Sequence, residues 1–311
     1  MVNVAIAGGL GNFGRTVTEV LNRQGKHQVS VLGRKAPDTK DSQVSFISVD
    51  YNDVKHLQAL LQDNEIHVVI SCLSLTDDSA IAAETNLIRA ADRSVATTRF
   101  ITSNWGTPVL GEMTEYMPWL KYKLAAINEL KSTKLEWTHF IVGYFLDYYG
   151  MPHVKTHLPP FLVSVDVANK LARIPGTGND AVTFTYSYDV AKFVAVALDM
   201  DKWEEETIVA GDKATWNEFL RLAEEIRGCQ FDVEYDSIEK LKTWQITELP
   251  SHVSSYGLYP KELMQFLMAG LERAMVAGML DLPFEKALNL RHPDIEVVKI
   301  EDMLRENWKT G

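Results

Sequence analysis

Three glycines spaced three residues apart follow the first apolar segment of the chain. Residues 2–7 are apolar and rich in β-branched side chains, which predicts a buried parallel strand; a helical pattern and a second apolar strand (29–32) come after the glycines. Glycines at such a turn permit a tight bend, let a pyrophosphate approach the backbone and let the helix pack close to the sheet. The sequence therefore predicts a dinucleotide-binding turn, with the phosphates at the helix N-terminus. The cofactor-binding residues expected in this turn are Gly8, Gly11, Asn12, Phe13 and Gly14.

The residues after the second strand indicate which dinucleotide binds. An NAD-binding unit usually places Asp or Glu about 20 residues beyond the glycines, where it bonds the ribose 2′-hydroxyl. Here that position holds Arg34 and Lys35. A carboxylate would repel a 2′-phosphate, whereas an arginine can hold it in a two-pronged hydrogen bond, with the lysine as a second charge. We therefore expect NADP(H).

Composition excludes several other classes of protein. The 311 residues carry 31 Lys and Arg against 42 Asp and Glu, and a net charge of −11 argues against a nucleic-acid-binding surface. No apolar run approaches the ~20 residues of a membrane span. Two distant cysteines, Cys72 and Cys229, are typical of reduced thiols in a cytoplasmic protein, and no spacing of histidines suggests a metal site. We expect a cytoplasmic monomer or homodimer with a small-molecule substrate.

Expected strands and helices alternate over about 145 residues, which is typical of an α/β fold with a doubly wound parallel sheet, a Rossmann fold. Beyond residue 150 prolines and turns interrupt this regularity. We expect residues 1–150 to form the cofactor-binding domain, with residues 182–200 returning to it, and residues 151–311 to form most of a second, smaller α+β substrate domain. The expected strands of the sheet also include residues 44–49, 68–73, 99–103 and 137–142, and its expected helices residues 54–61, 80–91 and 120–130.

Several motifs together resemble those of one family. In order along the chain they are residues 8–14 (GGLGNFG), 99–106 (RFITSNWG), 121–124 (KYKL), 138–147 (THFIVGYFLD), 189–191 (DVA) and 293–296 (PDIE). They resemble the NmrA-like, isoflavone-reductase-like branch of the atypical short-chain dehydrogenases. The resemblance implies NADP(H) binding and a Rossmann domain with a small substrate domain. It often implies reduction of aromatic or conjugated small molecules. One departure is Asn104-Trp105, where most relatives carry an acid and a phenylalanine or tyrosine.

The resemblance also implies a catalytic lysine. The ordinary short-chain Tyr-x-x-x-Lys pair is absent, because Tyr116 and Lys121 are five residues apart. The isoflavone-reductase-like branch instead uses one lysine at the start of this helix, and Lys121 is the matching position. Burial beside an oxidised nicotinamide would lower the pKa of this lysine towards the range of a useful general acid. Lys123 is the alternative.

The remaining site predictions concern the ends of the strands, where a doubly wound sheet binds its cofactor. Gly143, Tyr144 and Phe145 follow a buried strand and are expected to form an apolar wall beside the nicotinamide. The further residues predicted to bind the cofactor are Ser71, Leu73, Ser103 and Asn104. The side chains predicted to line a pocket for a large flat substrate are Trp105, Met113, Met117, Tyr148 and Tyr149.

These observations predict an NADPH-dependent oxidoreductase that reduces a C=C, C=O or C=N bond of a bulky aromatic or heterocyclic molecule in secondary metabolism. An alternative with the same site is a redox-assisted cyclase of a natural-product intermediate. An alternative from another class is an NmrA-type regulator that senses the dinucleotide without catalysis. Binding of oxidised cofactor alone, without a phosphate preference, would favour this regulator.

Overall fold

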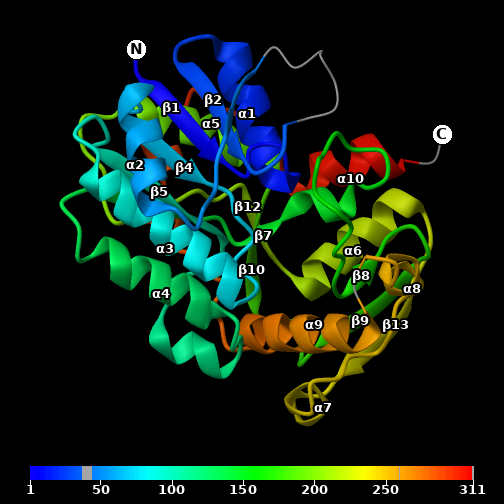
Figure 1. Ribbon diagram of the computed structural model, residues 1–311. Coiled ribbons are helices and arrows are strands. Elements are labelled where there is room, and N and C mark those ends of the chain that lie inside the picture. Colours follow the sequence, from blue (N-terminus) through cyan, green and yellow to red (C-terminus); the bar gives the residue numbers. More distant parts are fainter. Residues whose placement is uncertain (37–43, 259, 310–311) are drawn as a thin grey trace. The chain divides into compact units, whose positions relative to one another are not determined.

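The six apolar segments expected to form the sheet, together with a seventh strand that was not predicted, assemble into one sheet in the computed structural model, which describes residues 1–36, 44–258 and 260–309 (Figure 1). Its strands are β1 (Asn3–Ala7), β2 (Gln28–Gly33), β3 (Ser45–Ser48), β4 (Val68–Ser71), β5 (Arg99–Gly106), β6 (Glu136–Ile141) and β11 (Glu206–Ile208). They are ordered β3-β2-β1-β4-β5-β6-β11, and β1 pairs in parallel with both β2 and β4. The first six strands have the order of a dinucleotide-binding sheet, with the change of direction beside β1. The predicted Rossmann fold is confirmed.

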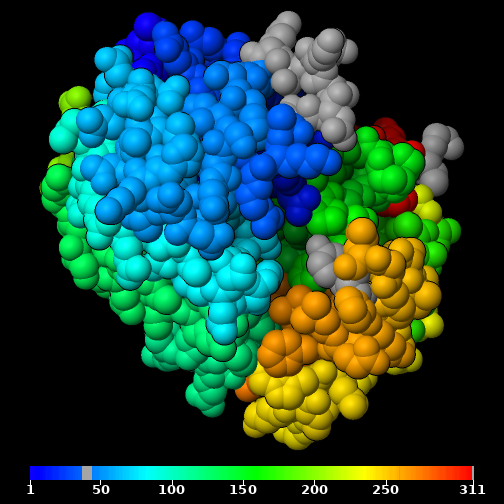
Figure 2. All heavy atoms as spheres, viewed as in Figure 1, coloured from blue at the N-terminus to red at the C-terminus, as the bar shows by residue number. Residues whose placement is uncertain are grey.

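Amphipathic helices flank this sheet. They are α1 (Asn12–Gln24), α2 (Val54–Asp63), α3 (Asp78–Arg93), α4 (Leu120–Leu130) and the part of α5 (Ser187–Asp199) from residue 190 onward. Helix α3 packs against both α2 and α4, and the surfaces of α2 and α3, in light blue and cyan, adjoin on one face (Figure 2). The side chains of Asp53 and Asp77 cap α2 and α3, satisfying N–H groups at the start of each helix.

The chain divides into two compact units. The first unit contains Met1–Trp105, Trp119–Ile141 and Val190–Thr207, and the second contains Gly106–Pro118, Val142–Asp189 and Ile208–Gly311. This division differs from the predicted boundaries in several places. Residues 106–118 and 142–150 belong to the second unit. The strand at 181–185, most of which lies in the segment expected to return to the cofactor-binding domain, pairs with strands of the second unit instead.

Two small sheets and several helices build the second unit. One sheet has the order β12-β10-β7 and the other β13-β9-β8. The strands are β7 (Tyr144–Phe145), β8 (Val165–Asp166), β9 (Leu171–Pro175), β10 (Ala181–Thr185), β12 (Asp212–Thr215) and β13 (Asp232–Asp236). The helices include α6 (Trp216–Arg227), α7 (Ile238–Lys242), α8 (Pro250–Ser255), α9 (Lys261–Val276) and α10 (Ile300–Trp308), and short 3₁₀ turns at Gly111–Glu115 and Leu146–Tyr149.

Aromatic side chains form the core of the second unit. Tyr149, Phe184, Trp216 and Phe219 pack with ring centroids 4.6–6.0 Å apart, and each of these side chains is almost fully buried. Trp216 and Phe219 lie on α6, which begins with a capping box between Thr215 and Glu218.

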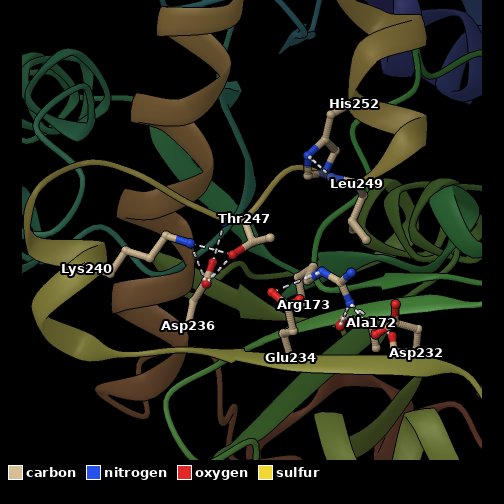
Figure 3. A network of polar contacts seen from close by, with 9 residues as sticks. All are labelled: Ala172, Arg173, Asp232, Glu234, Asp236, Lys240, Thr247, Leu249 and His252. Carbon is tan, nitrogen blue, oxygen red and sulfur yellow. Dashed lines mark hydrogen bonds and ion pairs between the residues drawn. The ribbon is translucent and has the colours of Figure 1, made fainter.

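Charged side chains fix the edge of the β13-β9-β8 sheet (Figure 3). Arg173 on β9 lies 3.5 Å from Asp232 and 3.7 Å from Glu234, both on the adjacent β13. At the end of β13 the buried carboxylate of Asp236 accepts hydrogen bonds from Lys240 Nζ (2.8 Å) and from the backbone N–H (2.6 Å) and hydroxyl (2.6 Å) of Thr247. Asp236 therefore links the two ends of the segment 240–247 by hydrogen bonds to both.

Candidate active site

The glycine turn has the shape that the sequence predicts. Strand β1 ends at Ala7, Gly8 has a positive φ of 74°, and Gly11 caps helix α1 and donates to Gly8 O (3.0 Å). A Cβ on Gly14 would lie 2.2 Å from the carbonyl oxygen of Gly8, so only glycine lets the helix approach this closely. Because these positions carry no side chains, the turn leaves a concave backbone surface that a pyrophosphate can approach.

A hollow of about 410 Å³ extends from this turn along the ends of β2 and β4. Its lining residues are Gly8, Leu10, Gly11, Asn12, Leu32, Gly33, Arg34, Lys35, Tyr51, Cys72, Leu73 and Ser74. A second hollow of about 290 Å³ shares Arg34, Tyr51, Leu73 and Ser74 with the first and continues to the start of α3. The Arg34 side chain is exposed and makes no hydrogen bond or ion pair with the described residues. The structure therefore brings the predicted Asn12, Arg34, Lys35 and Leu73 to the same hollow as the glycines.

Phe13, Ser71 and Ser103 face the protein instead of this hollow. Phe13 is buried and stacks on Trp105 with ring centroids 4.7 Å apart. The Ser71 hydroxyl bonds the Glu84 carboxylate, and the Ser103 hydroxyl donates to Leu73 O (2.6 Å). Their hydroxyls thus fix the ends of β4 and β5.

Glu84 of α3 is the residue that joins these strand ends, and the sequence analysis missed it. It is completely buried and accepts from the Ser71 hydroxyl, the Thr102 hydroxyl (2.8 Å) and the Ser103 N–H (3.1 Å). Burial raises the pKa of this carboxyl, while the three hydrogen bonds oppose that rise. One sequence signal could have identified it: Glu84 occupies the helical face that otherwise carries Leu87, Ile88 and Ala91.

The two candidate lysines of α4 differ in their surroundings. Lys121 is exposed, and its ammonium lies 4.8 Å from the centroid of the neighbouring Tyr122 ring. Lys123 Nζ instead donates to Asn104 Oδ1 (3.0 Å) at the end of β5. Burial lowers the pKa of Lys123 to about 8. The structure thus gives Lys123, not Lys121, the environment expected of a general acid.

Asn104 and His139 continue a directed chain of polar contacts from Lys123. Because Asn104 Oδ1 accepts from Lys123, its Nδ2 donates to His139 Nδ1, 2.9 Å away. A neutral His139 then carries its hydrogen on Nε2, which lies 3.6 Å from the Glu206 carboxylate. Asn104 and His139 are 1% and 2% exposed, so this network holds the Asn104 amide in one orientation.

Trp105, predicted to contact substrate, packs inside the first unit. Its ring lies between those of Phe13 and Phe140, with centroids 4.7 and 5.3 Å away, and its Nε1 donates to Ser71 O (3.0 Å). The ring is partly exposed. These contacts show that Trp105 fixes the end of β5 against the end of β4.

The other predicted residues lie in the second unit and are mostly buried. Gly143 has a φ of 74°, and a Cβ there would lie 2.2 Å from Thr183 O. The hydroxyls of Tyr144 and Tyr149 donate to Phe161 O and Val163 O. The predicted residues that are at most 9% exposed are Met113, Met117, Tyr144, Phe145 and Tyr149, whereas Tyr148 is partly exposed. Met113, Met117 and Tyr149 therefore belong to the interior, which corrects their prediction as pocket lining.

Two features are absent from the described part of the chain. No group of three or more His, Cys, Asp or Glu side chains there could hold a metal ion. None of its helices has both the length and the apolar character needed to cross a membrane.

Comparisons with known proteins agree with this geometry. Residues 8–156 match a family model described as NAD(P)H-binding. The chain is 33% identical to Oxidoreductase swnN of Metarhizium robertsii, covering 99% of this chain and 98% of that protein. It is 32% identical to Oxidoreductase BOA1 of Botryotinia fuckeliana, over 84% and 86% of the two chains. In structure it resembles the complex of leucoanthocyanidin reductase from Vitis vinifera with NADPH, with a TM-score of 0.73 and 15% identity over 98% of each chain.

These findings confirm the class of protein that the sequence predicts. The NAD(P)H-binding match agrees with NADP(H) as the cofactor, and the full-length relatives are oxidoreductases. The chain therefore belongs to the family of NAD(P)H-binding oxidoreductases that includes Oxidoreductase swnN, and it has the fold of an isoflavone-reductase-like enzyme, as the sequence resemblance implies.

Proposed function

We propose that this oxidoreductase uses NADPH to reduce a C=C, C=O or C=N bond of a bulky aromatic or heterocyclic small molecule in secondary metabolism. The observation that carries the proposal is the hollow that joins the glycine turn to Arg34, a cation without a hydrogen-bond or ion-pair partner in residues 1–36, 44–258 and 260–309. The fungal relatives named as oxidoreductases support reduction, and the likeness of fold to a leucoanthocyanidin reductase supports a flat, ring-containing substrate.

The residues of the first unit fit this cofactor. The glycine turn and the first N–H groups of α1 would hold the pyrophosphate. Arg34, assisted by Lys35, would bind a 2′-phosphate at the point where the two hollows meet. When bound, NADPH supplies the hydride.

Lys123 would supply the proton that balances this hydride. With a pKa of about 8 it is mostly protonated at neutral pH, yet it loses its proton more easily than an ordinary lysine. Its hydrogen bond to Asn104, which His139 and Glu206 orient in turn, would fix the direction of the remaining Nζ hydrogens. A regulator that only senses the dinucleotide needs no such lysine, so Lys123 favours catalysis.

Replacing Arg34 with alanine tests the choice of cofactor. We expect the Kd for NADPH to rise about 10- to 100-fold, because a charge-assisted hydrogen bond to the 2′-phosphate is worth about 1.5–3 kcal/mol. The Kd for NADH should change by less than about twofold, since NADH lacks that phosphate. Isothermal titration calorimetry measures both.

Arg93→Ala is the matched control, because Arg93 is an exposed arginine of the same unit at the last turn of α3. It should leave both dissociation constants unchanged. Equal weakening of NADPH and NADH by Arg34→Ala would contradict a role in reading the phosphate.

A further inference from the structure

Arg273 of α9 has an unusual environment in the second unit. Its guanidinium carbon lies 4.8 Å from the centroid of the Trp244 ring and 5.4 Å from that of the Tyr116 ring. Phe266 supports Trp244, with ring centroids 4.7 Å apart. The side chain of Arg273 makes no hydrogen bond or ion pair with residues 1–36, 44–258 or 260–309. Two aromatic rings therefore hold the cation while its N–H groups have no acceptor from the described chain.

Trp244 reaches this position through a strained backbone. It has a positive φ of 61°, which is uncommon for a bulky residue. The turn that contains it is held by Asp236, which binds Lys240 on one side and Thr247 on the other (Figure 3). Residues in such backbone conformations cluster at active sites and ligand-binding sites.

The guanidinium lines a pocket of about 400 Å³ that lies within the second unit. The lining residues are Glu115, Tyr116, Ile238, Leu241, Lys242, Arg273, Val276 and Ala277. Lys242 is a second cation, and it is exposed at the end of α7. Glu115 is the one carboxylate among these residues and is also exposed. Four aliphatic side chains complete the wall. The pocket thus combines a fixed cation, a small excess of positive charge and an apolar surface.

We propose that this pocket binds a small organic monoanion, a carboxylate carried on an apolar ring or chain. A guanidinium held over two aromatic rings can still offer its N–H groups, and a carboxylate matches two of them in parallel. The aliphatic wall would contact the apolar part of the ligand. Glu115 disfavours ligands with a second negative charge. The site is independent of the NADPH hollow, whose lining residues all belong to the first unit.

Calorimetric titration with benzoate, and with neutral benzamide as the matched probe, tests this proposal. The purified protein should bind benzoate and should bind benzamide at least 10-fold more weakly. Arg273→Gln should weaken benzoate binding at least 10-fold, since it removes a charge-assisted pair. Lys242→Gln should weaken it about threefold through the loss of an exposed charge. Arg291→Gln, which removes an exposed arginine elsewhere in the same unit, should have no effect.

The proposal is overturned if benzamide binds as well as benzoate, or if the folded Arg273→Gln variant retains benzoate binding. Should Arg273→Gln not fold, Lys242→Gln decides, because an exposed side chain at a helix end can be replaced safely. An unchanged affinity of Lys242→Gln would then count against the site. Titration of Arg273→Gln with NADPH separates this proposal from the proposed function, because NADPH binding should be unchanged.

Discussion

Replacing Lys123 with methionine should lower the turnover number for NADPH-dependent reduction by about two to four orders of magnitude, the usual contribution of a general acid. Methionine keeps most of the side-chain volume but cannot donate a proton. NADPH consumption, with a substrate found by screening aromatic and heterocyclic ketones, enones and imines, measures the effect. The Kd for NADPH should change little, because Arg34 and the glycine turn remain intact.

The pH dependence of turnover gives an independent test of Lys123. The pKa of Lys123 is about 8, and the protonated form is the proton donor in reduction. Turnover should therefore be constant below this pH and should fall about tenfold per unit as the pH rises above it. The opposite slope, with activity rising above pH 8, would indicate that Lys123 acts as a base.

Lys121→Met is the variant to compare, since the family resemblance points to Lys121 and the structure points to Lys123. The exposed Lys121 should contribute less to turnover than the half-buried Lys123, which is hydrogen-bonded to Asn104. A larger loss in Lys121→Met than in Lys123→Met would return the catalytic role to Lys121.

Glu84→Ala should lower the free energy of unfolding by about 3–5 kcal/mol, because it creates a cavity and leaves three buried donors without an acceptor. Those donors are the Ser71 and Thr102 hydroxyls and the Ser103 N–H. The same change should weaken NADPH binding, since the end of β4 borders the cofactor hollow. Urea unfolding and calorimetry measure the two effects.

Glu84→Gln separates hydrogen bonding from charge at this position. Its amide oxygen can accept from Thr102 and Ser103, and its NH₂ group can donate to the Ser71 hydroxyl, which is free to rotate. It also avoids burying a carboxylate, so we expect stability within about 1 kcal/mol of the natural protein. If Glu84→Gln were as destabilising as Glu84→Ala, hydrogen-bond geometry would not explain the role of Glu84.

The parts of the fold that depend on local pattern were predictable from the sequence. The glycine spacing, the apolar strands and the helix at residues 120–130 all match the structure, because each is determined within a short window of residues. The strand at 181–185 was expected in the large sheet but pairs with β7 and β12. Its own residues suit either sheet, so only contacts distant in sequence decide between them.

The candidate site was predictable to a smaller extent for the same reason. Backbone-defined positions such as Gly14 and Arg34 lie where the motif requires. Side-chain roles depend on neighbours that the sequence does not reveal: the Ser71 hydroxyl faces inward because Glu84 of α3 lies beneath it. Likewise, Lys121 and Lys123 project from different sides of α4, and because polar residues occur on several sides of this helix, the sequence does not show which lysine faces Asn104.

The most direct test of the account is calorimetric titration of the cofactor-free protein with NADPH, NADP⁺, NADH and NAD⁺ in one buffer. We predict that NADPH and NADP⁺ bind at least 10-fold more tightly than NADH and NAD⁺, because Arg34 meets the 2′-phosphate. Binding of the oxidised forms only, with no preference for the phosphate, would contradict both the role of Arg34 and the assignment as an NADPH-dependent reductase. It would favour a protein that senses the oxidised dinucleotide.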